Sequence, residues 1–314
     1  MIVVGLGVSW ILDGLEVQIV SAVGSVLQEP ETLGLSTADV GLVGSVYLLG
    51  EVVGALFFGR ITDRFGRRNI FIITLAIYLI GSGIAGLSFN LWFLLIFRFI
   101  AGAGIGGEYA AINSAIDELI PAHYRGRVDI AINGTYWAGA MIGAAASVFL
   151  LNPNLLAVGI GWRIGFFIGP VLGILIIFLR RHIPESPRWL MTHGRQQEAE
   201  QIVDDIESGL RDQGHELDPV DDTKRIEVTP QGPVRYLQIA KVMLREYPTR
   251  SLLGFTMMVT QAFLYNAIFF TYSLVLANVY NVPSRDIGYY FFPFAAGNLL
   301  GHCCSARCST PSAD

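Results

Sequence analysis

The chain has 314 residues, of which 53% are hydrophobic and only 15% are charged. A chain of this length that is so apolar is not a soluble domain, and the composition indicates a protein surrounded by lipid. The formal net charge is −5 and no basic patch with interleaved aromatic residues is visible, which argues against nucleic acid as a partner.

The first predicted membrane-spanning helix runs from about Val3 to Leu27 and contains two acids, Asp13 and Glu16. Carboxylates near the middle of a bilayer are costly, so both are expected to face the protein interior or a wet cavity. Their spacing of three residues places them on one face of the helix. Either acid could instead serve only as the buried partner of an arginine.

Two more spans, residues 40–59 and 69–88, flank a charged segment from Gly59 to Arg68, which we call the hinge segment. Each span is long enough to cross about 30 Å of hydrocarbon as a helix. The hinge segment contains four arginines, and basic residues in short loops stay on the cytoplasmic side. A loop that only sets the topology would explain this composition. Glu51, in the second span, is expected to be either a gate or a structural partner.

The fourth span runs from Trp92 to about Ala115 and contains Arg98 and Glu108. An arginine at this depth needs a counter-ion. At about 1.5 Å rise per residue, Arg98 lies roughly 10 Å below the outer surface and Glu16 lies near the midplane. We therefore predict an ion pair between Glu16 and Arg98 that protonation switches. Glu108 is an alternative gate residue on the cytoplasmic side.

Three further spans are predicted, at about 129–151, 162–179 and 251–278. Residues 191–250 are polar and form a cytoplasmic linker, with a helix from Gln196 to Leu210 and a mobile stretch from Gly214 to Pro233. Nearly all lysines and arginines fall in segments inferred to be cytoplasmic. This distribution predicts that the N-terminus is cytoplasmic.

The eighth span repeats the pattern of the second at a constant offset, because Gly50 and Gly54 correspond to Gly297 and Gly301. This repeat predicts a second basic hinge after Gly301. The chain instead continues as a tail, residues 302–314, that holds all three cysteines. A metal site is one interpretation, but the cysteines have no established ligand spacing. We predict an out-of-frame tail and no metal.

The hinge segment contains Gly59-x-x-x-Asp63-Arg64-x-Gly66-Arg67-Arg68, which resembles the loop between helices 2 and 3 of the major facilitator superfamily. Four other segments resemble patterns of the same superfamily. They are Trp10 to Glu16, similar to the first helix of sugar porters and aromatic-acid symporters; Gly107-Glu108-Tyr109, similar to metabolite:proton symporters; Glu118 to Gly126, typical of the next cytoplasmic loop; and Pro184 to Leu190, similar to the sugar-porter signature.

The resemblance implies an all-α membrane protein with the major facilitator fold. Residues 1–190 would form a six-helix N-terminal bundle, 191–250 a linker, and 251–301 the first two helices of an incomplete C-terminal bundle. The implied function is secondary transport of a sugar or small organic acid by alternating access, coupled to protons and without a cofactor. A non-functional truncated remnant of such a transporter is the alternative. A membrane enzyme is a third hypothesis, which no catalytic motif supports.

The resemblance also implies roles for individual residues. Those expected to couple protons or contact substrate are Asp13, Glu16, Arg98, Glu108, Gln261 and Asn266, although the last two could simply join helices. Those expected to close the cytoplasmic side are Gly59, Asp63, Arg64, Gly66, Arg67, Arg68, Glu118, Arg125, Glu185 and Arg188. The expected partners are a small-molecule substrate and the lipid bilayer. The protein is expected to be a monomer in a bacterial inner or plasma membrane.

Overall fold

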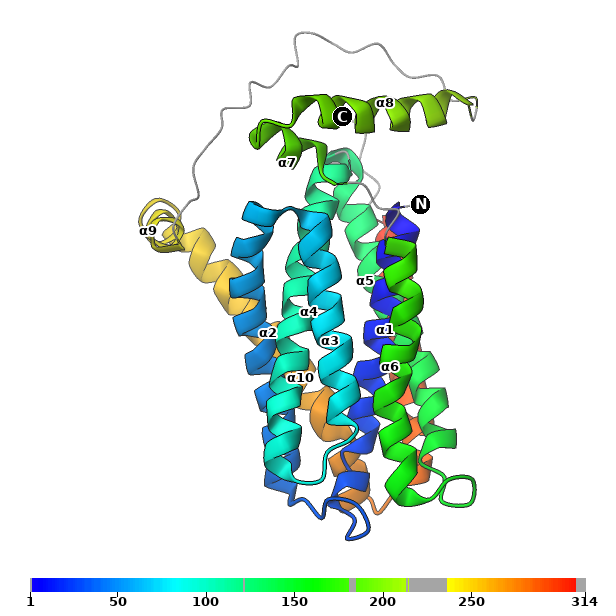
Figure 1. The fold of residues 1–314 in the computed structure, drawn as a ribbon. Coiled ribbons are helices and arrows are strands. Elements are labelled where there is room, and N and C mark those ends of the chain that lie inside the picture. The colour runs from blue at the N-terminus through cyan, green and yellow to red at the C-terminus, as the bar shows by residue number, and fades with distance from the viewer. Residues whose placement is uncertain (1, 121, 181–184, 213, 215–235, 309–314) are drawn as a thin grey trace.

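A computed structural model describes the chain except for residues 1, 121, 181–184, 213, 215–235 and 309–314 (Figure 1). Within the described residues, every regular element is a helix. The helices are α1 (Ile2–Val23), η1 (Val26–Gln28), α2 (Thr37–Phe65), α3 (Arg67–Ala85), α4 (Leu91–Leu119), α5 (Ala122–Leu150), α6 (Val158–Arg180), α7 (Pro187–Thr192), α8 (Gln196–Asp212), α9 (Tyr236–Glu246), α10 (Pro248–Asn278), η3 (Ser284–Asp286) and α11 (Ile287–Cys308).

The long helices alternate in direction, so that their connections gather at two ends of the molecule (Figure 1). The end that holds the α2–α3 connection, together with α7 and α8, is called the hinge end. The opposite end, which holds the α1–α2, α3–α4, α5–α6 and α10–α11 connections, is called the loop end. This alternation agrees with the spans predicted from hydropathy.

Local signals in the sequence set several helix boundaries. Ser36 and Asp39 form a capping box at the start of α2, and the Asn90 side chain accepts a 2.8 Å hydrogen bond from the Phe93 amide at the start of α4. Gly66 separates α2 from α3 with φ of +93°, a conformation that residues with a Cβ rarely adopt. The glycine therefore allows two long helices to follow each other with one residue between them.

Two pairs of helices meet along very close contacts. A Cβ atom added at Gly54 or Gly106 would overlap backbone of the opposite helix in the α2–α4 pair, and one at Gly14 or Gly139 would do so in the α1–α5 pair. Only glycine permits backbones to approach this closely. Helix α3 packs on α4 and α6, and α11 packs along α5. The glycine-rich composition thus reflects close packing of helices.

Five described segments are long and apolar enough to cross a membrane: Gly7–Gln28, Thr37–Phe65, Arg67–Ala85, Leu91–Asn113 and Pro248–Asn278. Helix α6 contains a shorter apolar stretch, Gly159–Ile174. The remaining two predicted spans correspond to α5 and α11, which are long helices of the same bundle. The all-α prediction is therefore confirmed.

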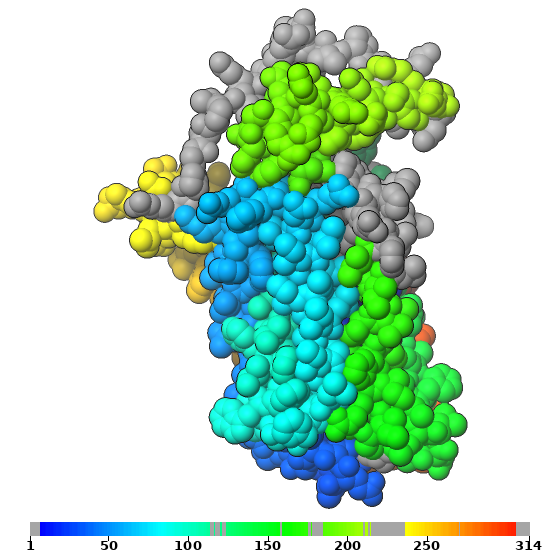
Figure 2. Space-filling model, in the orientation of Figure 1, coloured from blue at the N-terminus to red at the C-terminus, as the bar shows by residue number. Residues whose placement is uncertain are grey.

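The polar linker also contains the predicted helix, which is α8. Figure 2 shows α7 and α8 over the hinge end of α2 and α3, while α9 projects at the side of the bundle. The stretch predicted to be mobile lies almost entirely outside the described residues. Helix α11 continues through Cys308, beyond the point where the sequence departs from the repeat at His302. Whether residues 302–314 are out of frame stays a prediction.

Candidate functional site

Four charged side chains lie in the interior of the six-helix bundle and form what we call the charged cluster: Asp13, Glu16, Arg98 and Glu108. Each is at most 2% exposed. They come from only two helices, α1 and α4. Their burial agrees with the expectation that charges in a membrane span face the protein interior.

Glu16 is held by hydroxyl groups from α3. Its carboxylate accepts hydrogen bonds from Tyr78, at 2.5 Å, and from Ser82. On the α6 side it lies directly against Gly169, where an added Cβ would overlap a carboxylate oxygen. Residues of α3 and α6 therefore enclose this acid of α1.

Arg98 packs against aromatic rings. Its guanidinium carbon lies 4.0 Å from the centroid of the Tyr47 ring and 5.8 Å from that of Phe166. The Nε and Nη2 atoms are buried and make no hydrogen bond in the structure. Cation–π contact stabilises the charge without using its N–H groups.

The predicted ion pair between Glu16 and Arg98 is not formed in this structure. The two Glu16 oxygens are occupied by the α3 hydroxyls, whereas Arg98 lies over Tyr47. The third span, residues 69–88, contains no charged residue, so a search for ionic partners does not lead to its hydroxyl groups. Tyr78 and Ser82 are four residues apart, and this helical spacing was the signal that could have identified them.

An aromatic cluster joins the six-helix bundle to the helices that follow the linker. Trp10 stacks on Tyr109 with 4.6 Å between ring centroids, and it also contacts Tyr136 edge-on at 6.2 Å. The Tyr265 hydroxyl of α10 donates a 2.8 Å hydrogen bond to the Tyr136 hydroxyl of α5. Asp13 follows Trp10 by three residues and so lies on the same face of α1.

The two candidates on α10 lie elsewhere. Gln261 is exposed, and the Asn266 amide donates to the Ala262 carbonyl of its own helix at 2.9 Å. Tyr265, one residue before Asn266, makes the contact with the bundle instead. Polarity alone favours the amide side chains of Gln261 and Asn266. The rotation of α10 about its axis instead places the Tyr265 hydroxyl at the contact with α5.

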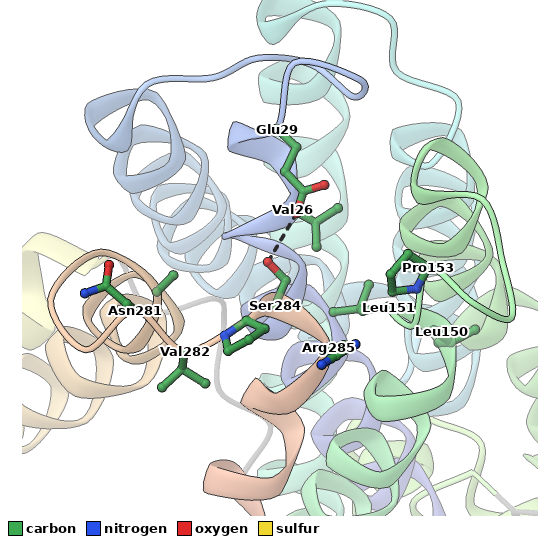
Figure 3. Close-up of a pocket in the computed structure, with 11 residues that line it drawn as sticks. Val26, Glu29, Leu150, Leu151, Pro153, Asn281, Val282, Ser284 and Arg285 are labelled. Carbon is green, nitrogen blue, oxygen red and sulfur yellow. Dashed lines mark hydrogen bonds between the residues drawn. The ribbon is translucent and has the colours of Figure 1, made fainter.

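At the loop end, α1 and α10 are joined directly. The Ser273 hydroxyl donates to the Ser21 carbonyl, and the Ser21 hydroxyl donates to the Phe269 carbonyl, both at 2.7 Å. Nearer the surface, the Ser284 hydroxyl donates to the Glu29 carboxylate at 3.2 Å (Figure 3). These contacts join α1 and the loop that follows it to α10 and η3 at the loop end.

A cavity of about 470 Å³ lies beside these contacts (Figure 3). It is lined by Val26, Glu29, Leu150, Leu151, Pro153, Ala277, Asn281, Val282, Pro283, Ser284 and Arg285. All of these residues belong to connections at the loop end or to the helix ends that flank them. The cavity shares no residue with the charged cluster, so the two are separate features.

At the hinge end, Glu185 contacts the first turn of α3. Its carboxylate accepts from the Arg67 amide at 2.8 Å and from the Arg68 amide at 3.3 Å, at a helix N-terminus that favours negative charge. The Trp189 indole N–H donates to the Asp63 carbonyl at 2.9 Å, and Asp63 also forms a 3.5 Å salt bridge with Arg67. The sugar-porter-like segment therefore docks on the hinge segment.

The other residues expected to close the cytoplasmic side do not join the contact between Glu185 and α3. Arg125 donates through Nε to the Ile120 carbonyl at 2.8 Å, within its own connection. Arg188 is exposed, and Arg64 is exposed with its guanidinium 5.4 Å from the Phe65 ring centroid. Gly59 faces Ala110 of α4. The side chain of Glu118 lies outside the described residues, so its expected role in closing the cytoplasmic side stays a prediction.

Buried charges enclosed by long apolar helices define this protein as a multi-pass membrane protein. The sequence profile of the family described as "Sugar (and other) transporter" matches residues 16–309. The chain therefore belongs to this family of sugar and other transporters.

Curated relatives carry several transporter names. The niacin transporter NiaP of Acinetobacter baylyi is 33% identical over 267 residues, which is 85% of this chain and 57% of that protein. The putative niacin/nicotinamide transporter NiaP of Bacillus subtilis is 33% identical over 58% of this chain and 44% of that protein. The chain thus spans about half the length of these relatives.

Solved structures agree with the fold. The major facilitator proton:xylose symporter XylE, bound to 6-bromo-6-deoxy-D-glucose, is 26% identical and covers 64% of this chain and 48% of its own, with a TM-score of 0.58. The partially occluded, inward-open xylose transporter XylE from E. coli covers 95% of this chain and 70% of its own. Its TM-score is 0.69 at 22% identity, which supports the major facilitator fold alone.

Proposed function

We propose that this chain is part of a secondary transporter that moves a small organic acid or a sugar across the membrane, coupled to protons through Glu16. The hinge end would face the cytoplasm, in a bacterial inner or plasma membrane, with the N-terminus on the same side. Transport would proceed by alternating access as a monomer, as in other transporters built from two related halves.

The observation that carries this proposal is the environment of Glu16. A carboxyl group that is 2% exposed and bonded to two neutral hydroxyls has no formal counter-charge among its hydrogen-bond partners. Tyr78 and Ser82 can donate to the carboxylate and can also accept from the protonated acid. Such a group can change its protonation state without losing its partners, as a proton carrier must.

Arg98 supports an acidic substrate over a sugar. Its buried Nε and Nη2 groups are parallel donors of the type that bind carboxylates in bidentate fashion. A carboxylate there would satisfy donors that otherwise stay buried without partners. Nicotinate is therefore a suitable first substrate, given the name of the Acinetobacter relative.

The test is uptake into proteoliposomes of radiolabelled nicotinate and of xylose, with and without an inward proton gradient. We expect nicotinate uptake to rise with the gradient and to lose this dependence in Glu16→Gln. Glu31→Gln, which changes an exposed acid in the α1–α2 connection at the loop end, is the matched control and should retain it. Gradient-dependent uptake by Glu16→Gln would contradict the coupling role, and no uptake of either compound would contradict transport by this chain.

A further inference from the structure

Helix α9, which lies between the linker and α10, is exposed along its whole length. All eleven of its residues are exposed in the structure, including Leu237 at 83% and Leu244 at 70%. Large apolar side chains in an isolated helix of a water-soluble segment would be unfavourable, because each leaves most of its surface in water. Their exposure indicates that a non-aqueous phase or a partner covers them.

The helix combines this apolar side with basic residues. Ile239 and Met243 are four residues apart and share one exposed side, whereas Lys241 and Arg245, also four apart, lie on the opposite side. Arg250 follows at the start of α10 and is also exposed. This pattern is typical of helices that lie in a membrane interface.

The neighbouring linker helix provides an internal contrast. Helix α8 is also amphipathic, but its polar residues are mostly acidic: Glu198, Glu200, Asp204, Asp205, Glu207 and Asp212, against a single arginine, Arg211. An anionic surface would therefore attract α9 and repel α8. The two helices therefore differ in the sign of their net charge.

The structure also fixes the depth of α9. Only Tyr247 separates it from α10, which begins at Pro248 and is a candidate membrane span. At its other end, the Tyr236 hydroxyl donates a 2.6 Å hydrogen bond to the carbonyl of Leu56 in α2, and the Arg60 guanidinium lies 5.7 Å from the Tyr236 ring centroid. Both ends of α9 are thus attached to spanning helices near the hinge end.

From these observations we propose that α9 lies in the membrane interface at the hinge end and binds the headgroups of anionic phospholipids. Ile239 and Met243 enter the boundary of the acyl chains, and Lys241 and Arg245 contact the lipid phosphates. The bilayer is the partner because α9 is held at the edge of two spans and carries complementary charge. This role is independent of solute transport and stands whether or not Glu16 carries protons.

The size of the effect follows from the charges. Each basic side chain near an anionic surface contributes about 1 kcal/mol, or about fivefold in association. Neutralising Lys241 and Arg245 together should therefore lower the preference for an anionic lipid by about thirtyfold at most.

The experiment uses the whole chain in nanodiscs, with Cys303, Cys304 and Cys308 replaced by serine. A fluorophore is placed at Met243→Cys or, for comparison, at Gln238→Cys, whose side chain points about 140° away around the helix. Quenching by nitroxide-labelled phosphatidylglycerol and by nitroxide-labelled phosphatidylcholine gives the relative association of the two lipids. Aqueous iodide reports exposure to water.

We expect lipid quenching to be stronger at position 243 than at 238, with iodide quenching in the opposite order. Phosphatidylglycerol should be preferred over phosphatidylcholine, and Lys241→Gln/Arg245→Gln should reduce this preference. Arg211→Gln in α8 is the matched control and should leave it unchanged. High salt should weaken the preference in the unaltered chain, which tests the charge effect even if the double variant does not assemble.

Equal iodide quenching at positions 243 and 238 would overturn the interfacial placement. No preference for phosphatidylglycerol, or a preference that survives the double variant, would overturn the role of the basic residues. Shielding of position 243 from both iodide and lipid would show that protein, not the bilayer, covers α9.

Discussion

The Tyr265 hydroxyl donates a hydrogen bond of 2.8 Å to the Tyr136 hydroxyl, and 129 residues of chain separate the two. Tyr136 belongs to the six-helix bundle, whereas Tyr265 belongs to the first long helix after the linker. This hydrogen bond connects the two parts of the chain midway along α5 and α10. The hydrogen bond is therefore one of the contacts that hold the two parts together.

Replacing either tyrosine with phenylalanine should destabilise this contact. We expect Tyr136→Phe or Tyr265→Phe to cost about 1 kcal/mol each, because one hydroxyl then remains part-buried without its partner. The double variant should cost less than the sum of the two. A double-mutant cycle on unfolding in detergent measures the coupling, and strictly additive effects would show that the hydrogen bond contributes nothing.

Gly169→Ala should disturb Glu16 through sterics alone. The added methyl group would overlap the Glu16 carboxylate, and overpacking of this kind costs about 1–3 kcal/mol. We expect a lower melting temperature together with loss of uptake. Gly297→Ala is the control, because nothing lies within 4 Å of a Cβ added there. Equal melting temperatures for the two variants would contradict the described contact.

Glu185→Ala should loosen the first turn of α3. The variant removes the carboxylate that accepts from the Arg67 and Arg68 amides, an interaction similar to a helix cap and worth about 1 kcal/mol. Faster hydrogen exchange is expected at these two amides. Glu198→Ala, which removes an exposed acid on α8, should not change exchange there. If Glu185→Ala also left it unchanged, the proposed docking would be wrong.

The linker helix α8 offers a prediction about pH. A hydrogen bond from Arg195 lowers the pKa of Glu198 below its usual value of 4.5, and the same pair raises the pKa of Arg195. Since the folded pKa of the acid is depressed, its contribution is present at neutral pH and is lost as pH falls through the lowered value. Carboxyl NMR titration should show the pKa of Glu198 rising in Arg195→Gln, and an unchanged value would exclude the pair in solution.

The arrangement of the spans could be predicted because hydropathy, helix length and the positions of arginines act locally along the chain. The hinge segment shows this, since the boundary between α2 and α3, at Gly66, falls inside the segment predicted to separate the two spans. Likewise, the acids of α1 were correctly expected to be buried. Such features depend on the free energy of placing each residue in the bilayer, and not on which residues lie next to it in space.

Side-chain partners could not be predicted in the same way. Glu16 and Arg98 were matched by depth and charge, but rotation of α3 about its axis gives the carboxylate two hydroxyl donors. Similarly, the resemblance grouped Arg125 and Glu185 with the hinge segment on the cytoplasmic side, and only the structure shows that Glu185 and Trp189 contact this segment. Partner choice depends on the relative rotation of several helices, which no single span encodes.

The glycine contacts between α2 and α4, and between α1 and α5, bring backbone against backbone. Because no side chain lies between them that could change rotamer, each pair should move as one stiff body. Glu16 belongs to the α1–α5 pair and Arg98 to the α2–α4 pair, so the charged cluster contains residues of both stiff pairs. The hydroxyls of Tyr78 and Ser82 connect Glu16 to α3, which packs on α4, and this polar contact, unlike the glycine contacts, can rearrange by rotamer changes.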